Sequence, residues 1–378
     1  MTHESIPNDD WQRTIERLGG AALLENEARE FGAFERARKI RCALDHLRLV
    51  LAYCWGTRGL RLTAAWAEAM GLASLSNVAL LKRVRNSADW LEHMVARLVG
   101  ARMAKAGGSE GRPVRLVDTT WVAKAGRDAY ESGGRWRVHS VFDLASERFT
   151  AFEVTEETES EVLDRADVVP GEIRVGDRAY LQPDRITKVL DGGGDVVVRA
   201  RWNGARWLDG DGARVELIPL LQKARGKGLI DQPIFIEGSA DEPMKLRLVA
   251  IRKPKQQRDL TIEKLKRKAR NKCRTLRPQT LIAAEWVIIV TSLDREHYPL
   301  SAISELYRLR WRIEIAFKHL KSGVGLRRPP AADPRSARAH ILCHLLLALL
   351  TEPLIAEHLG DSPRREAAYR TAFGGCCA

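Results

Sequence analysis

The sequence lacks the cysteine and histidine patterns that hold zinc or build a disulfide framework. Its six cysteines are scattered, none stands in a Cys-x-x-Cys pair, and no Cys/His cluster has zinc spacing. We therefore expect reduced thiols that serve mostly in packing. The sequence also has no P-loop, no Gly-x-Gly-x-x-Gly after a strand pattern and no His-Glu-x-x-His, so nucleotide hydrolysis and metalloprotease chemistry lack support.

Long hydrophobic runs are also missing. A membrane-spanning helix needs about 18 or more consecutive apolar residues, and the longest apolar stretch, 341–350, is interrupted by His344. The first ten residues are polar and acidic and do not resemble a secretory signal. These features predict a cytoplasmic protein with no membrane partner.

Acidic residues are outnumbered by basic ones. The chain of 378 residues has 62 Lys and Arg against 49 Asp and Glu, a net charge of +13. An excess of this size favours a polyanionic partner, nucleic acid before membrane. The length predicts two or three domains.

The N-terminal residues 10–104 have a helical pattern, with many Glu, Arg, Ala and Leu and few β-branched residues. Within it, 62–84 indicates a helix, a turn at Gly71 and a second helix capped near Ser74 or Ser76. Lys and Arg side chains gather at the far end of that second helix: Lys82, Arg83 and Arg85. Two interpretations stay open, a helix-turn-helix that contacts DNA and an ordinary helical hairpin.

A linker composition at 106–113 is followed by a mixed pattern of strands and helices. We expect an antiparallel meander, then helix, strand, helix and strand, which is the order of a ribonuclease-H-like α/β fold. The expected strands are 114–122, 136–144, 148–155, 173–180 and 196–201, and the expected helices are 161–168 and 183–190.

The next part, 202–253, indicates a β-rich insertion. Its strand candidates are 213–220, 233–238 and 244–251. Segment 252–277 carries twelve Lys and Arg against Asp259 and Glu263. It is either a solvated run or a segment that follows DNA phosphates, and the net charge favours the second interpretation. Residues 281–293 are then expected to form a buried strand.

A long helix is expected at 301–322, which contains neither proline nor glycine. Helical spacing separates it into two faces. The apolar stripe consists of Leu306, Leu309, Ile313, Ala316, Phe317 and Leu320, and a neighbouring face carries Tyr307, Arg310, Glu314 and Lys321, with Trp311 and Lys318 beside it. One carboxylate among cations suits a metal ligand next to a phosphate-binding surface. An amphipathic helix with a solvated charged face is the alternative.

Two aspartates occur in strand patterns. Asp118 lies in the middle of 114–122, and Asp177 ends an apolar strand beside Arg178. A buried carboxylate costs several kcal/mol unless it is paired or coordinated. For each alone, an ion pair or a strand-end turn is the simpler explanation. Together with Glu314 they could hold two divalent ions for an in-line phosphoryl displacement.

These residues resemble the bacterial insertion-sequence DDE transposases of insertion-sequence family four, whose signature is Tyr, two residues, Arg, three residues, Glu, six residues, Lys. Here the signature is Tyr307, Arg310, Glu314 and Lys321, and the segments around Asp118 and Asp177 match the two other acidic boxes. The resemblance covers roughly 114–326.

The resemblance implies that Asp118, Asp177 and Glu314 bind catalytic Mg²⁺ or Mn²⁺, as two ions. Tyr307, Arg310 and Lys321 would hold the terminal phosphates of the transposon end. Trp286 matches the position against which a flipped base stacks, with a buried core aromatic as its alternative role. The further DNA-contacting residues that we expect are Trp311, Lys318 and Arg178.

The same resemblance implies cut-and-paste transposition by a homodimer that joins transposon inverted repeats to target DNA. It predicts a helical end-binding domain at 1–105 and a core in two parts, 106–201 and 280–326. An insertion at 202–279 separates the two parts of the core, and a short helical C-terminal region follows at 327–378. Only 57 residues follow Lys321. Two alternatives to a transposase stay open. The first is a truncated or domesticated DNA-binding protein or repressor, which the short C-terminal region favours. The second is a stand-alone nuclease.

Overall fold

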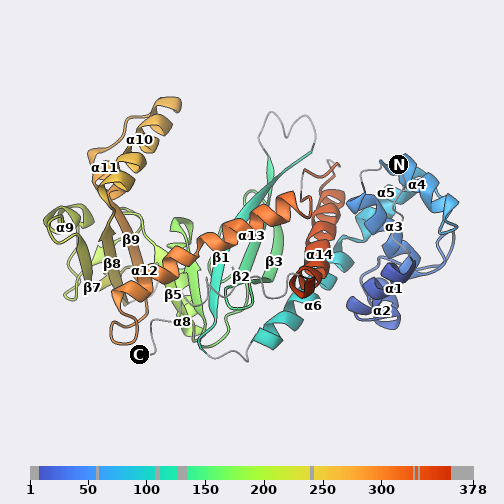
Figure 1. Cartoon of the computed structure of the whole chain (residues 1–378), viewed down its shortest axis with the longest axis horizontal. Helices are drawn as coiled ribbons and strands as arrows, with labels where there is room; N and C mark the ends of the chain where they lie inside the picture. The colour runs from blue at the N-terminus through green and yellow to red at the C-terminus, as the bar shows by residue number, and fades with distance from the viewer. Residues whose placement is uncertain are drawn as a thin grey trace.

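The computed structural model describes residues 8–56, 59–106, 111–125, 134–238, 242–326, 328–330 and 333–358. The molecule is elongated, with a large sheet towards one end and a helical bundle at the other (Figure 1). This is a mixed α/β architecture, as the sequence predicts.

The N-terminal part is helical, which confirms the pattern at 10–104. Its helices are α1 Asn8–Arg17, α2 Ala21–Glu30, α3 Ala43–Trp55, α4 Leu60–Ala69, α5 Asn77–Asn86 and α6 Ala88–Ala106. The expected cap of the second helix is present, because the Ser76 hydroxyl accepts a hydrogen bond from the Ala79 N–H at 3.2 Å. The expected linker begins later than predicted, since α6 continues through Ala106, and 107–110 lie outside the described residues.

A nine-stranded sheet forms the other half of the molecule, in the order β3-β2-β1-β4-β5-β9-β8-β7-β6. Its strands are β1 Val114–Ala123, β2 Arg135–Asp143, β3 Arg148–Glu156, β4 Ile173–Gly176, β5 Asp195–Arg199, β6 Trp207–Leu208, β7 Leu229–Ile236, β8 Met244–Arg252 and β9 Trp286–Thr291. The first three strands form the predicted antiparallel meander. Strand β4 is parallel to both β1 and β5, whereas β5 pairs with β9 in the antiparallel sense.

The helix expected at 161–168 is wrong, because that segment forms turns. The reason is Arg174, which is 1% exposed and therefore needs partners for its guanidinium. Its Nη atoms donate to the carbonyl oxygens of Leu163, Ala166 and Asp167 at 2.5–2.9 Å. The backbone is thus wrapped around the charge, and its carbonyls are not free for helical bonding.

The strands of the expected insertion extend the same sheet, because β8 pairs with β9 and β7 with β8. The strand expected at 213–220 is wrong, since helix α9 Leu217–Lys223 occupies much of that segment. Its buried residues Leu217, Ile218 and Leu221 follow helical spacing and pack on the sheet. The basic segment forms α10 Lys255–Asn271, which has no buried residue.

The strand expected at 281–293 is correct only in its second half. Helix α11 Pro278–Ala284 begins with proline, and β9 starts at Trp286. Between them, Glu285 receives Arg225 and Arg252 at 2.8 and 2.9 Å, which fixes the change of direction.

Two apolar layers cover the two faces of the sheet. One contains α12 Leu300–Leu309, α13 Trp311–Ser322 and α14 Pro334–His358, packed with the N-terminal helices. The other contains α8 Pro183–Asp191 and α9. Helix α14 lies beside α6 and joins the sheet to the helical bundle (Figure 1). No helix in the described part of the chain is long and apolar enough to cross a membrane.

The helix expected at 301–322 is divided in two at Arg310. Its N–H bonds to the Tyr307 carbonyl and its carbonyl accepts from Ile313, both i to i+3 contacts that tighten one turn. The two helices still run end to end across the sheet (Figure 1). The predicted apolar stripe faces the core, where Leu306, Ile313, Phe317 and Leu320 are buried.

Candidate active site

Asp118 projects from β1 on the face covered by α13, in line with its alternation with Leu116. Its Oδ1 accepts the Thr119 N–H at 2.8 Å, and its Oδ2 accepts from Arg310 Nη1 at 3.1 Å. Burial raises the pKa of Asp118 to about 6, and the negative charges of Asp177 and Glu314 add to the effect, while the two donors oppose it. A further cation beside this carboxylate would lower its pKa and favour the charged form.

Asp177 follows β4, the strand next to β1. The last pair of the parallel register is Leu116 with Val175, which places Asp177 level with Asp118 two residues further on. The Asp177 carboxylate caps the short 3-10 helix Arg178–Tyr180 by accepting the Ala179 N–H at 2.7 Å. Strand β4 ends at Gly176, where a side chain is excluded because its Cβ would lie 2.9 Å from the Tyr180 Cβ. The predicted strand to Tyr180 is therefore too long, but its aspartate lies at the expected edge.

Glu314 lies in the first turn of α13, one helical turn after Arg310. The Arg310 guanidinium donates to Glu314 Oε1 through Nη2 and to Asp118 through Nη1. Although burial opposes its charge, Glu314, Tyr307 and Asp118 raise the pKa of Arg310 overall. One arginine thus bridges two of the three predicted carboxylates.

A hollow of about 500 Å³ opens at this point. It is lined by Asp118, Thr119, Thr120, Glu314, Phe317, Lys318, Lys321 and Ser322. Phe317 closes the apolar side and stacks on Phe149 at 5.7 Å between ring centroids. The two lysines supply positive charge, and burial lowers the pKa of Lys321. The structure therefore places two predicted carboxylates and two predicted cations in one hollow.

A second group of cations surrounds Tyr307 and Arg178. The Arg199 guanidinium carbon lies 5.9 Å from the Tyr307 ring centroid. Burial lowers the pKa of Arg178, and repulsion from Arg199 adds to this shift. Burial also lowers the pKa of Lys253, to about 8, with the same two arginines contributing. An anion placed here would relieve the repulsion.

A hollow of about 510 Å³ adjoins these cations, between the sheet, α10 and α11. Trp286, Trp202, Arg178 and Arg277 are among its lining residues. The Trp286 side chain is only 1% exposed, and its Nε1 is buried with no hydrogen-bond partner among the described residues. Trp311 differs, because it is 46% exposed at the start of α13.

The sequence patterns did not predict the polar side chains that lie close to Asp118 and Asp177. The Thr119 hydroxyl lies 3.2 Å from both the Tyr180 hydroxyl and His139 Nδ1. Burial lowers the pKa of His139 to about 4, so the ring is neutral at pH 7. Glu161, from the turn segment after β3, is a fourth carboxylate near Asp177, and burial raises its pKa. Its position depends on the unexpected loop around Arg174, so no local signal could have identified it.

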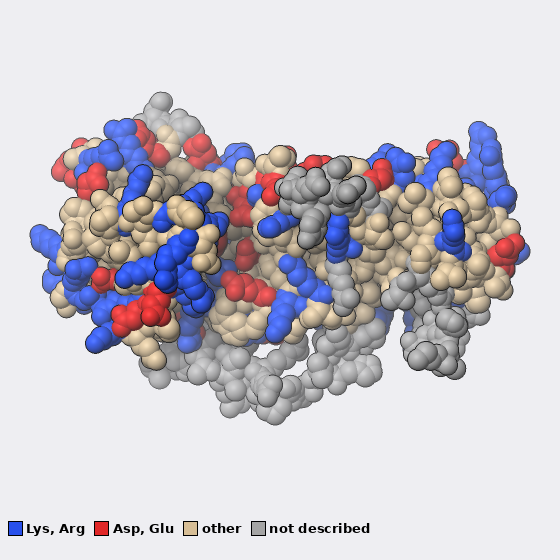
Figure 2. Space-filling view, turned by 90° about the horizontal axis from the view of Figure 1, so that it is seen from above, with Lys and Arg blue, Asp and Glu red and all other residues tan. Residues whose placement is uncertain are grey.

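Basic side chains gather over the end of the molecule that carries α10 and α11 (Figure 2). Helix α10 alone has seven Lys and Arg against two acidic residues. Within the described part of the chain, none of these seven cations forms an ion pair with a carboxylate. They are Lys255, Arg258, Lys264, Lys266, Arg267, Lys268 and Arg270. This end of the surface suits a polyanion.

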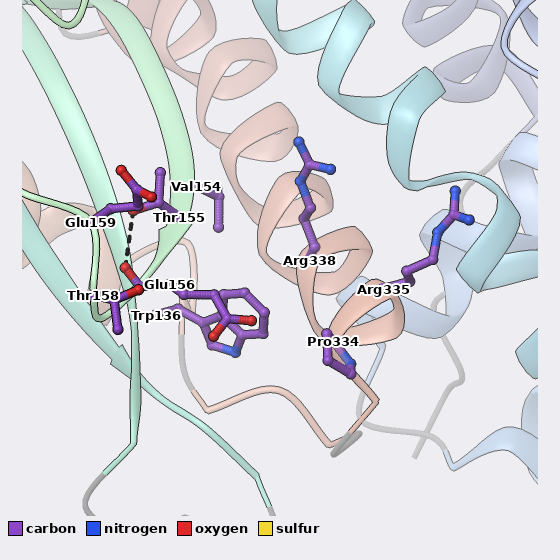
Figure 3. Close-up of a pocket in the computed structure, with 9 residues that line it drawn as sticks. All are labelled: Trp136, Val154, Thr155, Glu156, Thr158, Glu159, Pro334, Arg335 and Arg338. Carbon is purple, nitrogen blue, oxygen red and sulfur yellow. Dashed lines mark hydrogen bonds between the residues drawn. The ribbon is translucent and has the colours of Figure 1, made fainter.

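A third hollow, of about 400 Å³, lies between β2, β3 and the start of α14 (Figure 3). Its two arginines point towards α6, where Arg335 pairs with Asp89, and Arg338 with Asp89 and Glu92. On the strand side, Glu156 pairs with Lys124 at 3.0 Å. The charges are thus matched within the protein, and this hollow does not resemble an anion or metal site.

Within the described residues, no three Asp, Glu, His or Cys side chains form a ready-made metal cluster. The donors at the first hollow are nevertheless carboxylate oxygens, which are the ligands that Mg²⁺ and Mn²⁺ prefer. Arg310 now supplies the positive charge that Asp118 and Glu314 need. The residues therefore fit a divalent ion.

Comparison with known proteins shows the family to which this chain belongs. A family model described as a transposase DDE domain matches residues 109–350, which include Asp118, Asp177 and Glu314. The transposase for insertion sequence element IS421 of Escherichia coli is 36% identical over 363 residues, covering 94% of this chain and 97% of that protein. The provisionally named transposase InsL for insertion sequence element IS186A of E. coli K12 is 36% identical over 362 residues, with the same coverage. Domains of this family use divalent metal ions and act on DNA. The chain belongs to the family of transposases with a DDE domain and is an enzyme of DNA transposition.

Proposed function

We propose that Asp118, Asp177 and Glu314 jointly bind the divalent ions at which this transposase cuts and joins DNA. The observation that carries the proposal is the Arg310 bridge, which brings together carboxylates from β1 and α13 that are far apart in sequence. Asp177 lies next to Asp118 by strand register and raises its pKa. The ions would be Mg²⁺ or Mn²⁺, two in number.

When bound, the ions would supply activation of the attacking oxygen and stabilisation of the leaving oxygen. The protein's own residues prepare for this by holding Asp118 and Glu314 together through ion pairs with one arginine, Arg310, which an ion could replace. Arg310 would leave Asp118 and Glu314 and turn its guanidinium to a DNA phosphate, since arginine suits bidentate phosphate contacts.

The DNA end would lie along the first hollow. Lys318 and Lys321 line it beside the carboxylates and would contact phosphates. Tyr307 and Arg178 lie near the second cation group, which would receive the adjoining phosphates. Trp311 is exposed enough to contact DNA directly.

Trp286 would contact a flipped base only inside the hollow of about 510 Å³ between the sheet, α10 and α11. The hollow has room for a nucleobase, and its walls include a second indole, Trp202, and three arginines. Because Trp286 is 1% exposed, entry of a base would require α10 and α11 to shift away from the sheet. Stacking stabilises an extruded base by about 1–3 kcal/mol.

The order of β1 to β5, with β1 parallel to β4 and β4 to β5, supports a ribonuclease-H-like core at 106–201 and 280–326. We assign end binding to 1–105, the insertion to 202–279 and a short helical region to 327–378. The spacing of Tyr307, Arg310, Glu314 and Lys321 supports membership of insertion-sequence family four.

The reaction would be cut-and-paste transposition in the bacterial cytoplasm, on nucleoid DNA. Water attacks the phosphodiester at the transposon end and releases a 3′-OH. That hydroxyl attacks the opposite strand to form a hairpin, a second water opens it, and the 3′-OH then displaces a phosphodiester oxygen in the target. A homodimer would hold the two inverted repeats together.

The test uses a labelled DNA fragment that contains one end of the element, cut from the flank of the gene, incubated with Mg²⁺ or with EDTA and a target plasmid. We expect a metal-dependent nick at the end and joined products. Asp177→Asn should lose both, whereas Asp191→Asn, which changes an exposed carboxylate at the end of α8, should keep both.

Two results would contradict the proposal. Binding to the end without cleavage in Mg²⁺ or Mn²⁺ would favour a DNA-binding protein without strand transfer. Nicking without preference for the end, and without joined products, would favour a nuclease.

A further inference from the structure

The two aspartates of the candidate active site are held by different kinds of backbone. Asp118 lies within β1, opposite Ser140 of β2, and the antiparallel ladder continues on both sides of it. Asp177 lies beyond the end of β4, and the pairing of β4 with β1 stops before it, at Val175. Because the pairing of these two strands does not reach the carboxylates, their separation depends on other contacts.

Tyr180 links the turn that carries Asp177 to the strand that carries Asp118. The Asp177 carbonyl accepts the Tyr180 N–H at 3.2 Å and its carboxylate accepts the Ala179 N–H at 2.7 Å, which closes the turn. Tyr180 is 1% exposed, and its hydroxyl lies 3.2 Å from the Thr119 hydroxyl. Thr119 also donates its N–H to Asp118 Oδ1 at 2.8 Å. One threonine therefore contacts the first aspartate directly and the turn of the second through Tyr180.

The partners of the Thr119 hydroxyl give this link a direction. The Thr155 hydroxyl donates to the Glu156 carbonyl at 3.2 Å, so it accepts from His139 Nε2 at 2.8 Å. Because burial lowers the pKa of His139 to about 4, the neutral ring has its one proton on Nε2, and Nδ1 accepts from Thr119 at 3.2 Å. With its own proton used, the Thr119 hydroxyl is the acceptor for the Tyr180 O–H. Each proton thus has an acceptor in a chain that runs from the turn after β4 through β1 and β2 to β3.

Packing fixes the Tyr180 ring independently of its hydroxyl. The ring belongs to the apolar layer that also contains Val117 and Ile186. It also lies close to Gly176, where an added Cβ would be 3.1 Å from Cγ of the tyrosine. Tyr180→Phe keeps these apolar contacts, so that this substitution isolates the effect of the hydroxyl.

We propose that Tyr180 is a positioning residue whose hydroxyl, bound to Thr119, sets the separation of Asp118 and Asp177 for the divalent ions. The inference rests on the proposed function, because the two carboxylates are proposed ligands of those ions. Two neighbouring carboxylates repel each other, and the link opposes a movement of the Asp177 turn away from β1. Loss of a residue that orients a metal ligand lowers metal affinity or activity by about 10–100-fold.

The experiment compares wild type with Tyr180→Phe, Thr119→Val and Thr119→Ser. Valine has nearly the shape of threonine but lacks the hydroxyl, whereas serine keeps it. The matched control is Tyr298→Phe, which removes a hydroxyl that accepts from Arg112 at 3.4 Å near the start of β1. Mn²⁺ binding is measured without DNA by electron paramagnetic resonance, and single-turnover cleavage of a labelled transposon end is measured at increasing Mn²⁺. Urea unfolding reports the stability of each variant.

Tyr180→Phe and Thr119→Val should each weaken Mn²⁺ binding about 10-fold and raise by a similar factor the Mn²⁺ concentration that gives half-maximal cleavage. Thr119→Ser and Tyr298→Phe should bind Mn²⁺ nearly as wild type does. The double variant with Tyr180→Phe and Thr119→Val should lose no more than either single variant, because both changes remove the same hydrogen bond. A role in folding alone would lower the urea midpoint and leave the Mn²⁺ affinity of the folded protein unchanged.

Wild-type Mn²⁺ affinity in Tyr180→Phe would overturn the inference, and so would losses that multiply in the double variant. Asp118→Asn separates this result from the proposed function, since that variant should lose cleavage and bind Mn²⁺ weakly. If Asp118→Asn behaves as wild type, the proposed function is wrong. If Asp118→Asn fails while Tyr180→Phe is unchanged, only the role of Tyr180 is wrong.

Discussion

Arg310 occupies the position where a divalent ion would neutralise Asp118 and Glu314. Its side chain is 17% exposed and donates to both carboxylates. A guanidinium that is already placed at the site can move to a phosphate over a short distance when an ion replaces it. The residue would thus serve the metal-free and the DNA-bound states in turn.

Arg310→Ala should therefore weaken binding of the DNA end and reduce its salt dependence, by about one unit of slope for each lost phosphate contact. Arg310→Lys should recover part of the affinity, because lysine keeps the charge but not the bidentate geometry. Binding is measured between 50 and 200 mM salt, approximately the range in which such contacts are released. Arg308→Ala is the matched control, since Arg308 is exposed and pairs only with Glu305 in the described residues. Equal slopes for Arg310→Ala and wild type would show that Arg310 does not contact phosphate.

The raised pKa of Asp118 predicts a pH-dependent stability. The folded protein holds this proton up to about pH 6, whereas the unfolded chain releases it near the ordinary value of 3.8. Folded protein therefore binds more protons between these values, and stability falls as pH rises from about 4 to 6. Asp118→Asn removes the effect.

In EDTA, Asp118→Asn should be more stable than wild type at pH 7, by about 1–3 kcal/mol, and nearly equal at pH 4. Urea unfolding at the two pH values measures the difference. Added Mg²⁺ should stabilise wild type at pH 7 and much less at pH 4, because only the ionised carboxylate binds the ion. A constant difference across both pH values would show that Asp118 titrates normally.

At the scale of elements, α10 is the clearest electrostatic feature. It has no buried residue, and its seven cations are without carboxylate partners in the described residues. Replacing Lys264, Lys266, Arg267 and Lys268 by Gln should leave the unfolding free energy nearly unchanged, because exposed charges contribute little to stability.

The same variant should bind DNA more weakly and with a lower salt slope if α10 follows phosphates. The control replaces Arg206 and Arg214 by Gln, two cations that are already paired with Glu237 and Glu216. A variant of α10 with the wild-type salt slope would identify this helix as a solvated surface.

The elements that the sequence predicts well are those set by local pattern. Alternation along β1 places Asp118 on the face towards α13, and helical spacing places Glu314 one turn from Arg310. The break at Arg310 does not disturb that spacing, so the two predicted faces remain.

The errors arise where a distant partner decides the local structure. Arg174 takes the carbonyls of 163, 166 and 167, which removes the expected helix, and Glu285 holds two distant arginines at the change from α11 to β9. The same loop, whose carbonyls bind Arg174, also places Glu161 near Asp177. The spacing of hydrophobic residues along the sequence cannot reveal such long-range pairs.

At the scale of the whole molecule, one sheet runs from the meander to the far edge at β6. Of the strands of the expected insertion, β8 pairs directly with β9, and β7 and β6 continue the sheet that carries the aspartates. At the opposite end of the molecule, helix α14 packs against the N-terminal helices α3, α5 and α6. The N-terminal helical bundle, the carboxylates and the basic α10 are thus parts of one continuous structure, and the chain has a net charge of +13.

Glu314 is proposed to act with Asp118 and Asp177 in metal-dependent DNA cleavage. The most direct measurement is the single-turnover cleavage rate of a labelled transposon end in Mg²⁺ by wild type, Glu314→Gln and the control Glu305→Gln, with binding of the same DNA measured in EDTA. We predict that Glu314→Gln binds the DNA and cleaves it at least about 100-fold more slowly, while Glu305→Gln cleaves normally. Cleavage by Glu314→Gln at the wild-type rate would show that Glu314 does not take part in the reaction.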